Sequence, residues 1–120
     1  MKIVCDTSSI IKLQRGGTID YLGQLFEAVL IPHAVKKECR RPAKKVVLQK
    51  PFFQIHTVSR TLPLSRIYIG EQEAISLAVE HNISVVILDD EKAFRRALKQ
   101  GLVPLRSFRV LLLAKQRDCN

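Results

Sequence analysis

The sequence lacks several features that mark common classes of protein. It has no tryptophan, two tyrosines and five phenylalanines, and no apolar run that approaches the length of a membrane span. The apolar stretch at the N-terminus is much shorter than the core of a signal peptide, and it ends directly in the carboxylate of Asp6. These absences exclude a membrane-spanning protein, and cytoplasmic localisation is the default expectation.

Cysteine is also scarce. The chain has three cysteines, Cys5, Cys39 and Cys119, and their odd number and wide spacing fit neither a disulfide framework nor a pair of zinc ligands. We expect free thiols, with Cys5 as a small core residue of an apolar strand. The few phenylalanines are expected in the core rather than as platforms for stacked bases.

Acidic residues are outnumbered. The chain has 20 lysines and arginines against 11 acidic residues, a net charge of +9. Seven of these basic residues and one acidic residue lie between Lys36 and Lys50. Such an excess favours a polyanionic partner, and nucleic acid is the natural candidate. A merely soluble basic surface explains the charge equally well, so chemical evidence is needed as well.

At 120 residues the chain has the size of one domain, and we expect a single domain over 1–120. Helical and strand-like apolar patterns alternate along it. Helices are predicted at 10–13, 21–26, 33–38, 71–81, 93–99 and 110–114, and strands at 2–5, 28–31, 52–58, 84–88 and 102–105. This alternation predicts a three-layer α/β/α sandwich with a mainly parallel central sheet.

Carboxylates follow the predicted strands at the places where ligands bind in such folds. Asp6 ends the first strand, Asp89 and Asp90 end the strand at 84–88, and Glu71 begins the helix at 71–81. These positions share the edge formed by the carboxyl ends of parallel strands. Crowded carboxylates repel one another unless a cation neutralises them, and all-oxygen ligands favour Mg²⁺ or Mn²⁺. The sequence therefore predicts a metal site.

Each acid also has a purely structural explanation. Asp6 can be a helix cap, and Glu71 a favourable charge at a helix N-terminus. Asp89 and Asp90 can form a turn and a cap, although two caps in series are redundant. Only the four acids taken together predict a metal.

Four segments in order resemble the PIN domain, in particular its prokaryotic toxin-like branch. They are Ile-Val-Cys-Asp-Thr-Ser-Ser at 3–9, Ile-Pro-His-Ala-Val-Lys-Lys-Glu at 31–38, Gly-Glu-Gln-Glu-Ala-Ile-Ser-Leu-Ala at 70–78 and Val-Val-Ile-Leu-Asp-Asp at 85–90. The resemblance implies metal-dependent cleavage of single-stranded RNA. It also implies a homodimer and an antitoxin partner protein.

The resemblance also implies roles for particular residues. The implied acidic set is Asp6, Glu38, Glu71 and one of Asp89 or Asp90. Glu38 enters through the resemblance alone, and a surface glutamate among lysines is its alternative explanation. A polar supporting role near the metal is implied for Thr7 or Ser8.

The chain departs from the family pattern near its C-terminus. Members usually carry a Gly-Thr-like turn before the last apolar helix, where this sequence reads Leu-Arg-Ser-Phe at 105–108. Many members also continue for further helices beyond the position of Asn120. We therefore expect shortened C-terminal helices, which bears on oligomerisation and antitoxin binding.

Three hypotheses for function follow. The first is a Mg²⁺- or Mn²⁺-dependent endoribonuclease, with phosphate contacts from Lys36, Lys37, Arg95 and Arg96. The second is a non-catalytic RNA-binding or partner-binding module of the same fold. The third, a phosphoacceptor receiver domain, ranks last because its paired acids are expected on the first strand.

Overall fold

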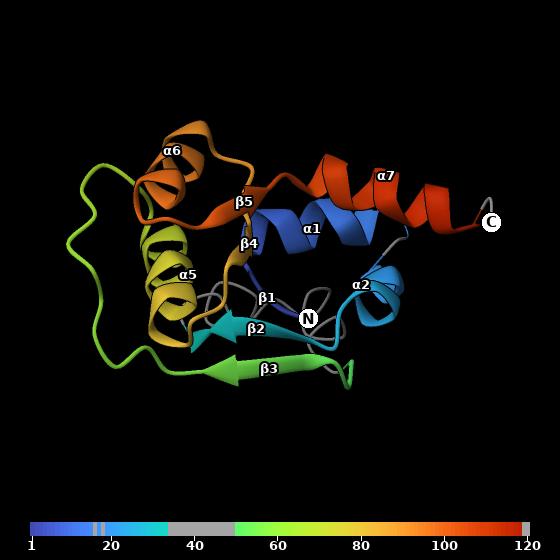
Figure 1. Cartoon of the computed structure of the whole chain (residues 1–120), viewed down its shortest axis with the longest axis horizontal. Helices are drawn as coiled ribbons and strands as arrows, with labels where there is room; N and C mark the ends of the chain where they lie inside the picture. Colours follow the sequence, from blue (N-terminus) through green and yellow to red (C-terminus); the bar gives the residue numbers. More distant parts are fainter. Residues whose placement is uncertain (16, 18, 34–49, 119–120) are drawn as a thin grey trace.

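The computed structural model describes residues 1–15, 17, 19–33 and 50–118. Within them, five parallel strands form one sheet in the order β3-β2-β1-β4-β5 (Figure 1). The strands are β1 (Lys2–Cys5), β2 (Ala28–Pro32), β3 (Phe53–His56), β4 (Val85–Ile87) and β5 (Val103–Leu105). The helices are α1 (Thr7–Arg15), α2 (Ile19–Leu25), α5 (Ile69–Glu80), α6 (Glu91–Lys99) and α7 (Ser107–Asp118).

The sheet separates two hydrophobic cores because successive side chains of a strand point to opposite faces. On one face, Ile3, Cys5 and Ile87 belong to the core under α1, α2 and α7. On the other face, Val4 and Val86 belong to the core under α5 and α6. The three central strands β2, β1 and β4 are buried along their whole length, apart from the first residue of β1. This explains why they read as continuous apolar runs.

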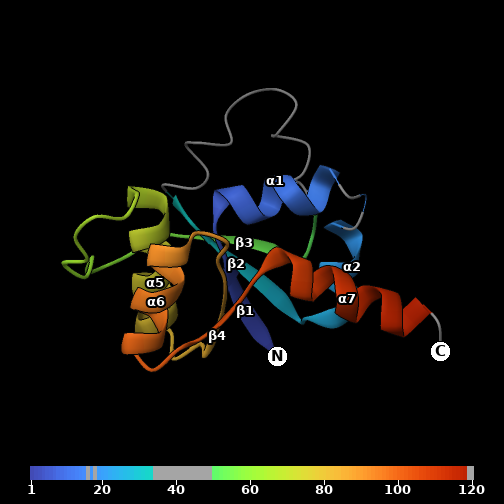
Figure 2. The ribbon, with the colours of Figure 1, turned by 90° about the horizontal axis from the view of Figure 1, so that it is seen from above.

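The helices form the two outer layers of the predicted sandwich. Figure 2, turned by a right angle from Figure 1, shows α5 and α6 together on one side and α1, α2 and α7 on the other. Direct packing joins α1 to α7 and α5 to α6. The predicted α/β/α architecture is thus confirmed. In the part of the chain that the structure describes, no helix is long and apolar enough to cross a membrane.

The topology fixes where a site can form. The chain leaves β1 toward β2 on one side, and β4 then pairs with the other side of β1. The strand order therefore reverses between β1 and β4, and in open parallel sheets ligands bind beside the carboxyl ends of the strands at such a point. Asp6 immediately follows β1, and Asp89 follows β4 by two residues.

Several local predictions need adjustment. The last helix begins at Ser107, earlier than the predicted 110–114, and Phe108 within it is 66% exposed rather than part of the core. Pro32 ends β2, where it pairs with His56 of the edge strand β3. The helix expected at 33–38 lies almost entirely outside the described residues.

Candidate metal and nuclease site

Asp6 connects the first strand to the first helix. Its backbone carbonyl accepts from the amide of Ile10, and its Oδ1 accepts a hydrogen bond of 3.1 Å from the amide of Ser9. Asp6 is therefore the N-terminal cap of α1, the structural role that its position also allows. The residue is only 2% exposed. A carboxylate at a strand end can serve both as a cap and as a ligand, because its two oxygens together offer about four lone-pair sites.

Asp89 accepts hydrogen bonds from residues of two helices, α1 and α7. Its Oδ2 accepts a hydrogen bond of 2.8 Å from the Ser9 hydroxyl of α1. Its Oδ1 accepts from both the amide and the hydroxyl of Ser107, each at 3.0 Å, at the start of α7. Ser9 is fully buried and also contacts the Asp6 carboxylate through its amide. One serine therefore bridges the two acids that the sheet brings together.

Asp90 has a different role. Its Oδ2 accepts a hydrogen bond of 3.0 Å from the amide of Ala93, and its backbone is extended, so it caps α6. The sequence left open which of the two adjacent aspartates faces the site. The structure connects Asp89 to Asp6 through Ser9 and gives the capping role to Asp90.

Glu71 lies in the first turn of α5 and is only 7% exposed. The chain enters α5 from the carboxyl end of β3, and α5 packs on β1, β2 and β4. Its first turn therefore belongs to the same edge of the sheet as Asp6 and Asp89. The partial positive charge of a helix N-terminus favours a carboxylate at this position.

Positive charges already face this edge. Lys12 of α1 places its Nζ 3.9 Å from Asp89 Oδ2, while the lysine remains 57% exposed. Arg106 donates a hydrogen bond of 2.8 Å to the Asp89 backbone carbonyl, stacks on the Phe94 ring and pairs with Glu91. The hydrogen bond from Arg106 lowers the pKa of Glu91. The loop after β4 is thus fixed by cations as well as by caps.

Other predicted site residues are placed only in part. Glu38, Lys36 and Lys37 lie outside the described residues. Thr7 and Ser8 occupy the first turn of α1. On α6, Arg95 is exposed and forms an ion pair of 3.1 Å with Glu91, while Arg96 is half-buried.

Three polar residues of this site were not predicted from the sequence, namely Ser9, Lys12 and Ser107. Ser9 follows Asp6 by three residues, which is the spacing at which a helix cap meets an amide, so its position carried a readable signal. Lys12 lies one turn further along the same helix, three residues after Ser9. Ser107 contacts Asp89 across 18 residues of sequence, and no local sequence pattern predicts this contact.

The donor set fits a small, hard divalent cation. Within residues 1–15, 17, 19–33 and 50–118, no group of three or more acidic, histidine or cysteine side chains is arranged to hold a metal ion. Mg²⁺ does not require such a cage, because it keeps several waters and binds through one or two carboxylates plus substrate phosphates. Asp6 and Asp89, connected through Ser9, are two carboxylates of the kind that such an ion prefers.

Comparison with known proteins gives consistent results. The family model described as "DUF3368: PIN domain" matches residues 2–119. Among solved structures, the chain is similar to a PilT N-terminus domain protein from the hyperthermophilic archaeon Sulfolobus solfataricus, with a TM-score of 0.69 and 20% identity. That match covers 95% of this chain and 93% of the other, and it shows a shared fold. No curated protein is similar enough to count as a match.

The family match extends over nearly the whole chain and includes all four segments that carried the resemblance. The parallel sheet and its two helical layers agree with it independently. The chain belongs to the PIN domain family.

Proposed function

We propose that this protein is a metal-dependent endoribonuclease that hydrolyses phosphodiester bonds in single-stranded RNA. The PIN domain is generally a nuclease fold, and its nucleases generally use divalent metal ions. The observation that carries the proposal is the Asp6–Ser9–Asp89 connection at the point where the strand order reverses. Two carboxylates that lie far apart in the sequence are connected there through one serine.

The proposed roles follow from the contacts. Asp6 and Asp89 would hold Mg²⁺ or Mn²⁺. Glu71, in the first turn of α5, is the further acid that the family resemblance implies. Glu38 stays an assisting acid that the family resemblance implies. When bound, such an ion lowers the pKa of a water and stabilises the leaving oxygen in an in-line displacement.

The protein's own groups would position the reactants. Ser9 and Ser107 hold the two oxygens of the Asp89 carboxylate, and the amide of the same Ser9 holds Asp6. Lys12 is anchored against Asp89 yet more than half exposed, so its ammonium can reach a phosphate oxygen at the site. Asp90 would act indirectly, by holding the N-terminus of α6.

The cleavage test uses a fluorescent single-stranded RNA with Mn²⁺, Mg²⁺ or EDTA. Wild-type protein should cut it in Mn²⁺ or Mg²⁺ and not in EDTA, whereas Asp6→Asn should not cut it under any condition. Asparagine caps helices about as well as aspartate, so this variant should keep α1 intact. Metal-dependent cleavage by Asp6→Asn at the wild-type rate would refute the proposed site.

A non-catalytic RNA-binding module is the second candidate. Lys12 favours it, because a fixed ammonium beside Asp89 could neutralise the acid pair without a metal. This candidate predicts RNA binding that weakens with salt, requires no metal and yields no product. The same assay separates the two, because binding without cleavage in all three solutions would favour the module.

The toxin role, an antitoxin partner and a homodimer remain proposals drawn from the family resemblance. They predict that expression of the active protein stops growth, and that Asp6→Asn removes the effect. Sedimentation of the purified protein tests the dimer.

A further inference from the structure

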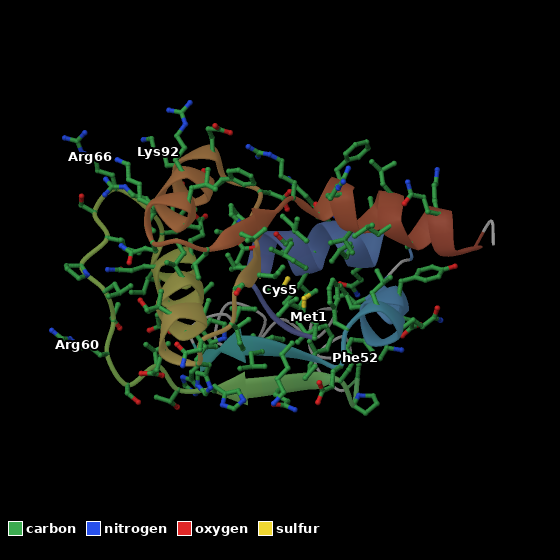
Figure 3. The ribbon with its side chains drawn as sticks, viewed as in Figure 1. Met1, Cys5, Phe52, Arg60, Arg66 and Lys92 are labelled. Atoms are coloured by element: carbon green, nitrogen blue, oxygen red, sulfur yellow. The ribbon has the colours of Figure 1, made fainter. Side chains whose placement is uncertain are left out.

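A strongly basic hollow lies beside the candidate site, between α6 and the segment that precedes α5. It has a volume of about 240 Å³, and its lining residues are Ser65, Arg66, Lys92, Arg95, Arg96 and Lys99. We call it the basic hollow. Arg66 and Lys92 both line the hollow, and Figure 3 labels them at the same corner of the molecule.

One wall of the hollow is a row of cations along α6. Lys92 and Lys99 each lie three or four residues from Arg95 and Arg96, so the four cations project from one side of the helix. The row extends for about 10 Å, given the rise of 1.5 Å per residue. It begins two residues after the Asp90 cap, and therefore starts at the edge of the sheet that carries Asp6 and Asp89.

The opposite wall is anchored. The segment 57–68 inserts Leu64 into the core, where it is 7% exposed, and Ile67 packs against the same core. Ser76 and Gln72 of α5 form hydrogen bonds of 2.9 and 2.7 Å with the backbone of Leu62. Arg66 is therefore held between two fixed points while its own side chain stays exposed.

The backbone of Arg66 supports a specific placement. Its φ of +66° is in the left-handed region of backbone conformations, which residues other than glycine rarely adopt. Such conformations persist where the surrounding structure fixes them, and they cluster at binding and active sites. Here the turn directs an arginine toward the cations of α6.

The charge of the hollow is largely uncompensated. Arg95 is paired with Glu91, but in the described part of the chain Arg66, Lys92, Arg96 and Lys99 form no ion pair or side-chain hydrogen bond. Four like charges around one hollow repel one another, and an anion with several oxygens would relieve that repulsion. The lining contains no aromatic side chain on which a base could stack.

We propose that the basic hollow binds successive phosphates of a single-stranded polynucleotide and leads the strand to the acid pair. A row of cations suits an extended backbone better than one compact phosphate. The lining has no aromatic, asparagine or glutamine side chain, so we expect the contacts to go mainly to phosphates and to depend weakly on base sequence. The direction of the strand toward Asp6 and Asp89 rests on the proposed function, whereas the binding itself does not.

The test measures the binding of a fluorescent single-stranded RNA by anisotropy in EDTA. It uses the Asp6→Asn background, so that no cleavage interferes. The hollow variant replaces Arg66, Lys92 and Lys99 with glutamine. The control variant replaces the exposed cations Arg60, Arg109 and Lys115 with glutamine and removes the same charge elsewhere. Arg60 lies on the same segment as Arg66 but far from it in Figure 3.

The hollow variant should bind at least about tenfold more weakly than its parent. Its slope of log K against log salt should fall by about 2, as expected when three contacts to a single strand are lost. The control variant should keep the slope of the parent. Equal losses in both variants, or no RNA binding by the parent, would overturn the proposal.

Two further measurements keep the outcome decisive. Thermal melting checks the fold of each variant. If the triple variant melts early, the single variant Arg66→Gln replaces it, and this variant should bind RNA about threefold more weakly than the parent.

Pyrophosphate serves as a competitor. If it displaces labelled RNA as well as unlabelled RNA does at equal phosphate concentration, the site takes a small phosphate and the proposal is wrong. RNA binding that depends on the hollow, without cleavage by the wild type, would support this inference and refute only the nuclease.

Discussion

The Ser9 hydroxyl donates a hydrogen bond of 2.8 Å to Asp89 across 80 residues of sequence. The same serine donates its amide to Asp6, so the geometry of the acid pair depends on one small buried side chain. A Ser9→Ala variant should lose about 1 kcal/mol of unfolding free energy, because Asp89 loses a donor. It should also bind Mn²⁺ about tenfold more weakly, as is usual when a residue that orients a metal ligand is lost.

Ser76→Ala is the matched control for this prediction. Ser76 is also buried and its hydroxyl also forms hydrogen bonds, but its partners are the backbone of Gln72 and Leu62 rather than an acid of the site. Urea unfolding should show comparable destabilisation of both variants, while a Mn²⁺ titration should separate them. A similar change of Mn²⁺ affinity in both would contradict the bridging role.

The adjacent aspartates provide a second test. Asp90→Asn should keep the stability of the protein within about 0.5 kcal/mol and keep RNA cleavage, because asparagine caps helices as well as aspartate does. Asp89→Asn should lower the cleavage rate by more than about 100-fold, because it removes a proposed metal ligand. Losing a residue that only orients a ligand typically costs up to about 100-fold. Single-turnover cleavage of labelled RNA gives both values, and the reverse ranking would transfer the ligand role to Asp90.

Lys12 provides a third test, because its ammonium competes with any cation at Asp89. Lys12→Gln should bind Mn²⁺ about threefold to fivefold more tightly, since a pair of charges 4 Å apart in water interacts with about 1 kcal/mol. Lys50→Gln removes the same charge from a distant pair with Asp20 and should leave Mn²⁺ affinity unchanged. Weaker Mn²⁺ binding by Lys12→Gln would show that the lysine supports the site rather than competing in it.

The histidine at the end of β3 predicts a dependence of stability on pH. Burial, together with the nearby His81 and Lys2, lowers the pKa of His56 below its ordinary value of 6.5. Between the folded and unfolded pKa values the unfolded chain binds more protons, so stability rises with pH through this window. The contribution is complete above pH 6.5 and is lost as the pH falls through the folded pKa.

Thermal melts at pH 7.5, 6.5 and 5.5 test this. His56→Gln should lose less stability on acidification than the wild type, whereas His33→Gln, at an exposed position, should follow the wild type. Parallel losses in wild type and His56→Gln would show that another group governs the effect.

The sequence predicted the sheet well because buried central strands produce apolar runs that end in polar residues. Val85–Ile87 is the clearest case. The edge strand Phe53–His56 was predicted too long, at 52–58. Two of its four residues are exposed, so the apolar pattern that marks a buried strand is weak there. The start of α7 was missed because Ser107 is fixed by Asp89 rather than by its own neighbours.

The candidate site was predicted less completely than the fold. The topology alone placed Asp6, Glu71 and Asp89 at one edge of the sheet. The separate roles of Asp89 and Asp90 depend on which carboxylate meets α1 and which meets the amide of Ala93, and composition does not encode this. Arg66 was not anticipated, because its place opposite α6 follows from how the segment 57–68 is pinned on α5.

The attachment of Asp89 to both α1 and α7 has a consequence for biosynthesis. The acid pair cannot be completed on a growing chain until β4 has joined β1 and Ser107 has begun α7. A ribosome would therefore carry an inert precursor for most of the time that it translates this domain. For the proposed nuclease, this order of assembly would keep the messenger being read out of reach until the fold is nearly finished.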